Sequence, residues 1–156
     1  MLASIFKVFI ARKEFFLELL LEHIQISIIS IALAMVIGLV IGFVISEFKK
    51  STKVVLGIVN SVYTIPSISL LGFLIPITGI GNKTAIIALT IYALLPMVRN
   101  THAGLTNINP LLVEAAFGMG STKMQVLLKI KLPLAMPIII AGVRNMAVMT
   151  IALAGI

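Results

Sequence analysis

The most constraining feature of the sequence is Ile24–Ser46, a run of 23 residues without a charged side chain. As an α-helix rising about 1.5 Å per residue, it would be about 35 Å long, enough to cross the roughly 30 Å hydrocarbon core of a bilayer. Three further apolar stretches follow, at 54–75, 84–98 and 134–156. The sequence therefore predicts an all-α fold, a polytopic transmembrane helical bundle with these four spans.

The composition supports the membrane class and argues against an enzyme. Hydrophobic residues make up 60% of the chain and charged residues 11%, whereas a soluble domain carries roughly 25% charge. The chain has no Cys and no Asp, and neither of its two His belongs to a catalytic motif. We therefore expect no catalytic site, no metal and no other cofactor. The net charge of +7 bears on membrane orientation rather than on nucleic acid, which we do not expect as a partner.

Residues 1–23 are predicted to form an amphipathic N-terminal leader. Glu14, Glu18 and Glu22 recur at every fourth residue, so a helix would align them in one stripe. Three glutamates also argue against a cleaved secretory signal. The leader is expected either to lie in the membrane interface, in contact with lipid, or to be a plain solvated helix.

Small residues recur at steps of four within the first span. They are Ser30, Ala34, Gly38, Gly42 and Ser46. Such a ridge lets two helix backbones approach closely in lipid. The spacing predicts that this span packs on another helix instead of serving as a generic membrane anchor.

The second apolar stretch, 54–75, contains Pro66, which removes a helical hydrogen bond and bends or breaks the helix. Broken backbone at membrane depth is tolerated where protein buries it or where it lines a water-filled cavity. The alternative is a kink with a purely structural role. The candidate pathway residues at this break are Tyr63, Thr64, Pro66 and Ser67.

Arg144 lies inside the fourth apolar stretch and is a further pathway candidate. An arginine at membrane depth is expected to face the bundle or a polar cavity, unless it snorkels to the cytoplasmic interface. The same stretch ends at residue 156 without a polar tail. We therefore expect a chain truncated at its C-terminus, inside or just after its fourth span.

The distribution of Lys and Arg predicts the orientation. Basic residues concentrate in the 47–53 loop and in the 99–132 stretch, whereas the 76–83 turn holds only Lys83. Loops rich in Lys and Arg stay in the cytoplasm. With four spans, the two basic segments fall on the cytoplasmic side and the leader falls outside.

The 109–133 segment is predicted to form a helical hairpin on the cytoplasmic face. Asn109 before Pro110 is typical of a helix start, with Asn as the N-cap and Pro at the first helical position. Gly118 and Gly120 are expected to end that helix, with a left-handed backbone at Gly120.

A second helix is predicted over 123–131. Ser121 or Thr122 can cap its start, and Pro133 is expected to stop it. The hairpin is then either a docking element for a soluble partner or a loop that packs on its own bundle.

Seven positions of this hairpin match the pattern E-A-A-x3-G-x9-I-x-L-P. They are Glu114, Ala115, Ala116, Gly120, Ile130, Leu132 and Pro133. On this motif the chain resembles the EAA-loop permease subunits of bacterial ABC importers. The resemblance implies that the hairpin is a coupling helix seated in a groove of a separate ATPase subunit.

From about residue 24 onward, the chain is similar to the permeases of glycine betaine, carnitine and choline uptake systems. The stretches that carry this similarity are Thr64-Ile65-Pro66-Ser67, 71–76, 95–101 and Gly118-Met119-Gly120. The resemblance implies a multi-pass subunit of the bacterial inner membrane that is not itself an enzyme. The implied partners are ABC ATPase subunits, a second permease copy or a homologous permease, and an extracytoplasmic solute-binding protein.

The solute itself stays open at this point. Aromatic cages often hold quaternary ammonium ligands, and this chain has no Trp and only two Tyr. This scarcity indicates that selectivity lies on the binding protein. The alternatives are a permease for another small solute, such as methionine, a sulfonate or ergothioneine, or a membrane scaffold with no pathway of its own.

Overall fold

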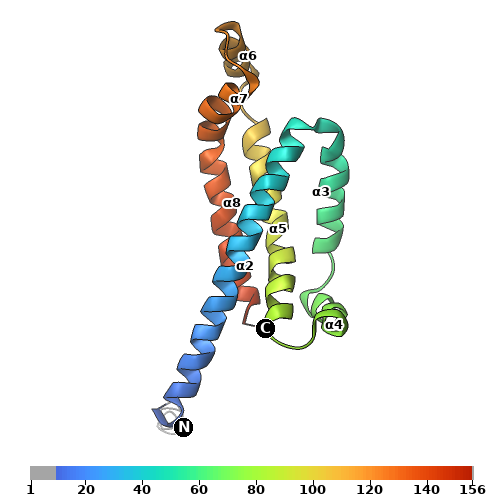
Figure 1. The fold of residues 1–156 in the computed structure, drawn as a ribbon, viewed down its shortest axis with the longest axis vertical. Coiled ribbons are helices and arrows are strands. Elements are labelled where there is room, and N and C mark those ends of the chain that lie inside the picture. Colours follow the sequence, from blue (N-terminus) through green and yellow to red (C-terminus); the bar gives the residue numbers. More distant parts are fainter. Residues whose placement is uncertain (1–9, 156) are drawn as a thin grey trace.

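The computed structural model describes residues 10–155, and helices dominate this part of the chain. Residues 1–9 of the predicted leader lie outside the described residues. The helices are α2 (Lys13–Glu47), α3 (Lys49–Tyr63), α4 (Ser67–Thr78), α5 (Asn82–Thr106), α6 (Pro110–Gly118), α7 (Lys123–Val126) and α8 (Leu132–Leu153), with a π turn at Leu127–Lys131 between the last two. Figure 1 shows α2, α3, α5 and α8 side by side, with α6 standing at one end.

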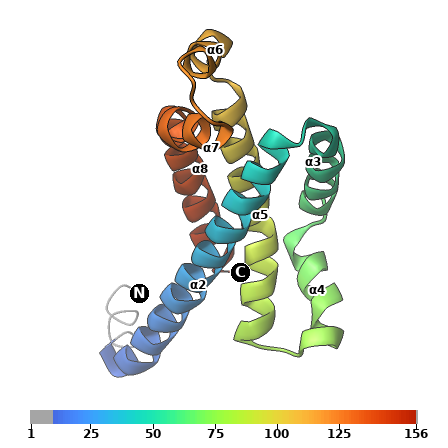
Figure 2. The same cartoon turned by 45° about the horizontal axis from the view of Figure 1, so that its top comes forward.

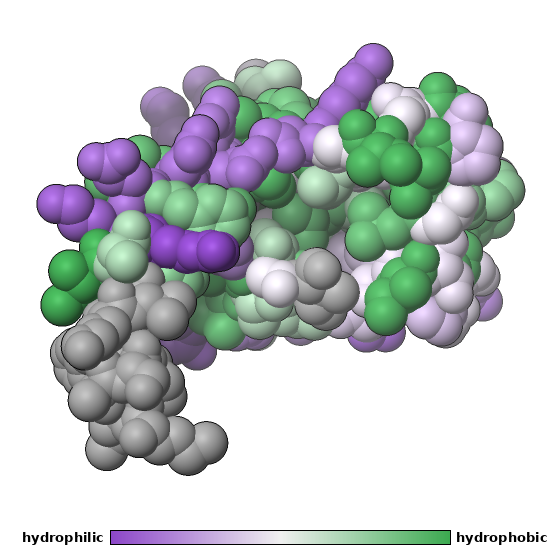
Figure 3. Space-filling model, turned by 90° about the horizontal axis from the view of Figure 1, so that it is seen from below, coloured by the Kyte–Doolittle hydropathy of each residue, from purple (hydrophilic) through white to green (hydrophobic). Residues whose placement is uncertain are grey.

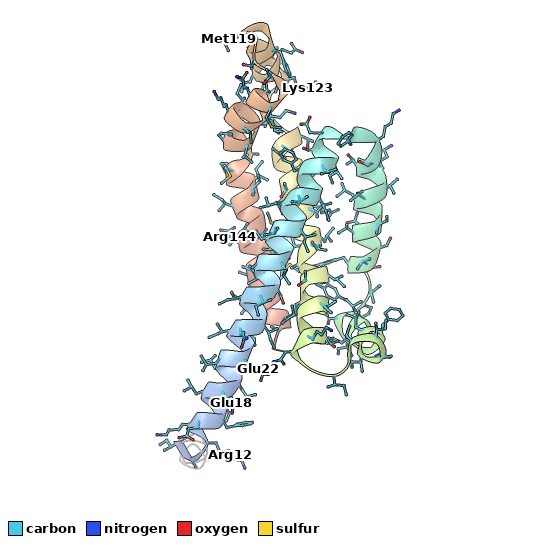
Figure 4. The ribbon with its side chains drawn as sticks, viewed as in Figure 1. Arg12, Glu18, Glu22, Met119, Lys123 and Arg144 are labelled. Atoms are coloured by element: carbon cyan, nitrogen blue, oxygen red, sulfur yellow. The ribbon has the colours of Figure 1, made fainter. Side chains whose placement is uncertain are left out.

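The described part of the predicted leader is continuous with the first span. α2 runs for 35 residues without interruption, about 52 Å, so its first turns continue directly into the apolar span. No Gly or Pro interrupts the chain between Lys13 and Ile24, and the Leu and Glu residues there favour helix. The N-terminal end of α2 therefore protrudes beyond the bundle, with Glu18 on the protruding part (Figure 4). Glu22 still contacts the bundle, because its carboxylate accepts a hydrogen bond from the Asn82 side chain at the start of α5 at 2.6 Å.

The second apolar stretch, predicted as 54–75, is two helices that extend over a longer range. α3 and α4 are bent by 94° at a short break between Tyr63 and Ser67. Pro66 has an extended backbone, with ψ of 141°, so α3 ends before it and α4 begins after it. α2, α5 and the continuous Lys123–Leu153 helix are each long and apolar enough to cross a membrane, and the bent pair is a fourth candidate.

Two other helices differ in length from the predicted ranges. α5 covers Asn82–Thr106, well beyond the predicted 84–98, because Arg99 and the polar residues after it continue the helix. α8 begins at Leu132, two residues before the predicted range 134–156, and ends at Leu153, within that range. Hydropathy marks only the apolar part of each helix, whereas the hydrogen-bonded helix continues into polar sequence.

α5 is the central helix, with α2 and α8 on one side and the α3–α4 pair on the other (Figure 2). The predicted small-residue ridge of α2 is confirmed, since all five of its residues are buried. A Cβ added at Gly38 would lie 2.7 Å from Cβ of Met97, and one added at Gly42 would lie 2.5 Å from Cβ of Thr101. The two backbones are therefore too close for any residue larger than glycine at these positions.

The contact between α5 and α8 also depends on glycines that let the two backbones approach closely. A Cβ added at Gly142 would lie 2.5 Å from Cβ of Asn100, and one added at Gly104 would lie 3.2 Å from Ala135. Seen from the end opposite α6, hydrophilic residues gather on one side, and hydrophobic and weakly polar residues occupy most of the other side (Figure 3). The bundle thus has two distinct ends, one bearing the hairpin and the other bearing the α3–α4 break.

Candidate functional site

The predicted hairpin projects from one end of the bundle. α6 packs appreciably only on α7, so it stands clear of the four long helices (Figure 1). The predicted helix start is confirmed: the Asn109 side chain accepts a hydrogen bond from the Leu111 amide at 3.0 Å, with Pro110 at the first helical position. The cap satisfies one of the amides that a helix N-terminus leaves without a partner.

The turn after α6 is tightly specified. Gly120 has φ of +82°, the left-handed conformation that the sequence predicted. Its amide donates to the Phe117 carbonyl at 2.9 Å, and the Ser121 amide donates to the Ala116 carbonyl at 3.1 Å. This pair of bonds is a Schellman motif, which ties the last carbonyls of the helix to the residues beyond it.

The next helix begins immediately after this turn. The Thr122 hydroxyl accepts from the Gln125 amide at 3.3 Å, and the Gln125 side chain accepts from the Thr122 amide at 2.8 Å. This capping box confirms Thr122 as the helix start. With a Schellman motif on one side and a capping box on the other, the hairpin has a fixed bend.

The prediction that Pro133 stops this helix is wrong. α7 continues through the π turn into α8, and the helical path from Lys123 to Leu153 is unbroken. In the π turn the Leu132 amide bonds to the Leu127 carbonyl, one residue farther back than in an α-helix. This widened turn gives room for a proline, whose ring would otherwise clash with the preceding turn. The hairpin is therefore joined rigidly to a long helix.

Large apolar side chains on the outer surface of the hairpin are exposed, with no covering partner among residues 10–155. The exposed ones are Leu111, Leu112, Phe117, Met119, Met124 and Leu128. In Figure 4, Met119 marks the tip of the hairpin and Lys123 marks the start of α7. A loop that packed on its own bundle would bury these residues, and here Met119 is 80% exposed.

The motif residues divide into two sets by position. Glu114 and Ala115 are exposed on α6, whereas Ala116 is buried. Glu114 also lines a cavity of about 330 Å³ at the base of the hairpin, together with Ser46, Thr106 and Lys131. The remaining motif residues, Ile130, Leu132 and Pro133, lie at the junction with α8, where the first two are half-buried and the third is exposed.

The break between α3 and α4 brings together two aromatic rings. Tyr63, at the end of α3, packs edge-to-face on Tyr92 of α5, with ring centroids 5.8 Å apart. The Tyr92 hydroxyl donates to the Ile65 carbonyl inside the break. Tyr92 was not among the predicted pathway residues. Its only signal in the sequence is that it is one of two tyrosines.

The other candidates at the break differ in exposure. Thr64 and Pro66 are exposed on the surface of this chain. Ser67 is half-buried and lines a cavity of about 60 Å³ between α4, α5 and α8. Of the four candidates at the break, Tyr63 and Ser67 are half-buried next to other helices, whereas Thr64 and Pro66 are exposed.

Arg144 does not face the interior of this chain, although one of the two predicted locations was the bundle. It is exposed about halfway along α8 (Figure 4). Gly142 and Met146, two residues to either side, are buried against α5, and a two-residue step turns an α-helix by about 200°. Arg144 therefore points to the opposite face, where no carboxylate of residues 10–155 pairs with it.

The described ionisable groups form few clusters. Lys131 and Glu47 make one ion pair, with Nζ and Oε1 2.9 Å apart. Across residues 10–155, no group of three or more His or Glu side chains is arranged to hold a metal ion. What the described residues offer is a projecting hairpin, a broken helix with an aromatic pair and an outward-facing arginine.

Comparison with known families decides the class of the chain. Residues 12–156 match the family described as "binding-protein-dependent transport system inner membrane component". The chain belongs to this family. Membership places it in the inner membrane as a transport component, in agreement with its long apolar helices.

Relatives of the chain are permease proteins for osmoprotectants. It is 40% identical to the choline transport system permease protein OpuBB of Bacillus subtilis over 124 residues, which is 80% of this chain and 57% of the relative. The glycine betaine/carnitine/choline permease OpuCB of the same organism matches to the same extent. Identity to the osmoprotectant import permease OsmW of Salmonella typhimurium is 39%, over 86% of this chain and 65% of that one.

The fold is also found in a solved transporter. The inward-facing MetNI methionine ABC transporter superposes with a TM-score of 0.75 at 30% identity, covering 84% of this chain and 67% of that one. The predicted all-α ABC importer permease fold is thereby confirmed. The chain spans somewhat more than half the length of the Bacillus relatives that it matches.

Proposed function

We propose that the chain is a permease subunit of an ATP-driven ABC importer for compatible solutes of the glycine betaine, carnitine and choline type. Support for the solute class comes from the relatives, whose names specify choline, carnitine and glycine betaine. Support for the importer class comes from the family and from the fold shared with a methionine ABC transporter.

The projecting hairpin is the single observation that carries the mechanism. It has a fixed bend, an exposed apolar surface and a rigid junction with α8. An element with these properties can bind a soluble protein and transmit movement to the helix that it joins. An ATPase subunit bound there would move α8 when ATP closes the ATPase pair, and the permease would supply no hydrolytic chemistry itself.

Within the hairpin, the seven motif residues divide among four roles. Glu114 and Ala115 present the contact surface, and Ala116 is buried where the hairpin closes. Gly120 sets the bend because its positive φ suits glycine. Ile130, Leu132 and Pro133 then transmit the movement through the π turn into the membrane-spanning part of α8.

A second permease subunit completes the proposed pathway. An arginine facing hydrocarbon is costly, about 2.5–3.5 kcal/mol at a helix centre on insertion scales. Outward-facing Arg144 therefore belongs against another copy or a homologous permease, lining a polar path with the break residues Tyr63, Thr64, Pro66 and Ser67. A solute-binding protein delivers the solute at the end opposite the hairpin, and ATP shifts the population between outward-open and inward-open states.

A methionine importer is the second candidate, because a solved methionine ABC transporter shares this fold. The experiment is uptake of labelled glycine betaine, carnitine, choline and methionine by cells that depend on this transport system. We expect saturable, ATP-dependent uptake of at least one quaternary ammonium solute, and no competition by methionine. Uptake of methionine alone would reverse the assignment, and ATPase-independent behaviour with no uptake would favour a scaffold.

A further inference from the structure

Both tyrosines of the chain meet at the α3–α4 break, although they come from different helices. Tyr63 and Tyr92 pack edge-to-face, with their ring planes at 67°. Tyr63 donates to Sδ of Met149 on α8 at 3.7 Å, and Tyr92 donates to the carbonyl of Ile65. These contacts hold the pair between α3, α5 and α8. Because each hydroxyl is already hydrogen-bonded, the rings and not the hydroxyls are available to a ligand.

A small apolar cavity lies against Tyr92. Its volume is about 60 Å³, whereas one water needs about 10–15 Å³ in the same measure. The cavity can therefore admit a group of several heavy atoms. Alanine and leucine side chains of α4, α5 and α8 form most of its wall, together with the Ser67 side chain and the Tyr92 ring, and no charged residue lines it.

We propose that the Tyr63–Tyr92 pair and this cavity form a weak, transient site for the quaternary ammonium group of the transported solute. A quaternary nitrogen has no N–H and cannot donate a hydrogen bond, so aromatic faces and apolar contacts are the groups that recognise it. The site deepens the proposed function and rests on it for the solute class.

The lack of an acidic group fits a site on a pathway. A carboxylate next to a desolvated cation would hold it strongly, and a transport site must also release its solute. The pair lies toward the end of the bundle that is opposite the hairpin, since α4 occupies that end (Figure 1). In the proposed orientation this is the side on which a binding protein would release the solute.

The chain provides its own reporter for this site. It contains no Trp and two Tyr, so tyrosine emission of the purified 156-residue chain comes entirely from the proposed site. We would titrate the purified protein with choline and with 3,3-dimethylbutan-1-ol, a neutral isostere in which carbon replaces the quaternary nitrogen. We expect a saturable change in emission with choline and none with the alcohol. An equal response to both compounds would overturn the proposal, because the cavity would then bind any apolar group.

Two variants of Tyr63 test the contribution of its ring and of its hydroxyl separately. Tyr63→Leu should weaken choline binding about tenfold, as read from the remaining Tyr92 emission, whereas Tyr63→Phe should bind like the unchanged protein. Phe73→Leu is the matched control, because Phe73 is an exposed ring elsewhere on α4. Unchanged binding in a folded Tyr63→Leu protein would also overturn the proposal. If that variant does not fold, the comparison of choline with the alcohol still decides.

The emission assay needs neither ATPase nor transport, so it is independent of the proposed function. A chain whose emission responds to choline but that imports only methionine would contradict the proposed solute class and leave the site in place. A chain that imports choline without any response of its tyrosines would contradict the site alone.

Discussion

Lys131 and Glu47 join the base of the hairpin to the end of α2, with Nζ and Oε1 2.9 Å apart. Lys131 is the last residue of the π turn, and Glu47 is the last residue of the first long helix. Both side chains are partly exposed, so the pair is expected to contribute only about 0.2–1 kcal/mol to stability. Its position matters more than its strength, because it connects the hairpin junction to a helix that packs on α5.

We expect Glu47→Lys and Lys131→Glu each to slow solute uptake while leaving the amount of protein in the membrane unchanged. Each substitution places two like charges together at the junction and pushes the π turn away from α2. The Glu47→Lys/Lys131→Glu double variant restores opposite charges and should recover most of the uptake. A double variant no better than its parents would show that the pair does not couple the two elements.

Gly42→Ala should destabilise the bundle by about 1–3 kcal/mol, since overpacking a close helix contact forces the backbones apart. Its new Cβ would lie 2.5 Å from Cβ of Thr101 and 3.0 Å from the Val98 carbonyl oxygen, and backbone cannot move cheaply. Gly57→Ala is the matched control because nothing lies within 4 Å of its Cβ position. Thermal unfolding of both variants in detergent checks this, and equal melting temperatures would contradict the close approach of α2 and α5.

Arg144→Leu should abolish uptake or reduce association between two differently tagged permease copies. The substitution removes the one charged group on the outer face of α8 that the proposed second subunit would meet. Val148→Leu, one turn farther along the same exposed face, should have no effect. If Arg144→Leu gives unchanged uptake and unchanged association, the arginine only snorkels to the interface.

The topology can be tested without removing any native thiol, because the chain has no Cys. In intact cells, cysteines at Lys50 and Ser121 should react only with membrane-permeant reagents, since both positions are predicted to be cytoplasmic. A cysteine at Ile80, which is 91% exposed near the opposite end, should react with impermeant reagents. The reverse pattern would invert the orientation.

Local features of the hairpin could be predicted from sequence because each depends on neighbouring residues. The Asn109 cap, the left-handed Gly120 and the Thr122 capping box are all satisfied within a few positions. The small-residue ridge of α2 was also predictable, since a spacing of four residues places its members on one helix face.

The features that sequence could not supply depend on distant or compensating structure. Pro133 was expected to end a helix, but a π turn one step earlier accommodates its ring. Tyr92 lies at the candidate site only because α5 packs on the break after Tyr63. The outward direction of Arg144 follows from which face of α8 meets α5, and hydropathy does not specify that face.

The most direct test of the coupling mechanism is co-purification of the ATPase with hairpin variants, measured together with uptake. Gly120→Val places a β-branched residue at φ of +82° and should distort the bend, and Glu114→Lys reverses the charge on the exposed face of α6. Gly118→Ala is the control, because Gly118 is helical and its added Cβ would meet nothing within 4 Å. We predict that the first two variants reach the membrane but lose ATPase binding and uptake, whereas the control keeps both. Normal co-purification and normal uptake in Gly120→Val and Glu114→Lys would contradict the assignment of the hairpin as the coupling element.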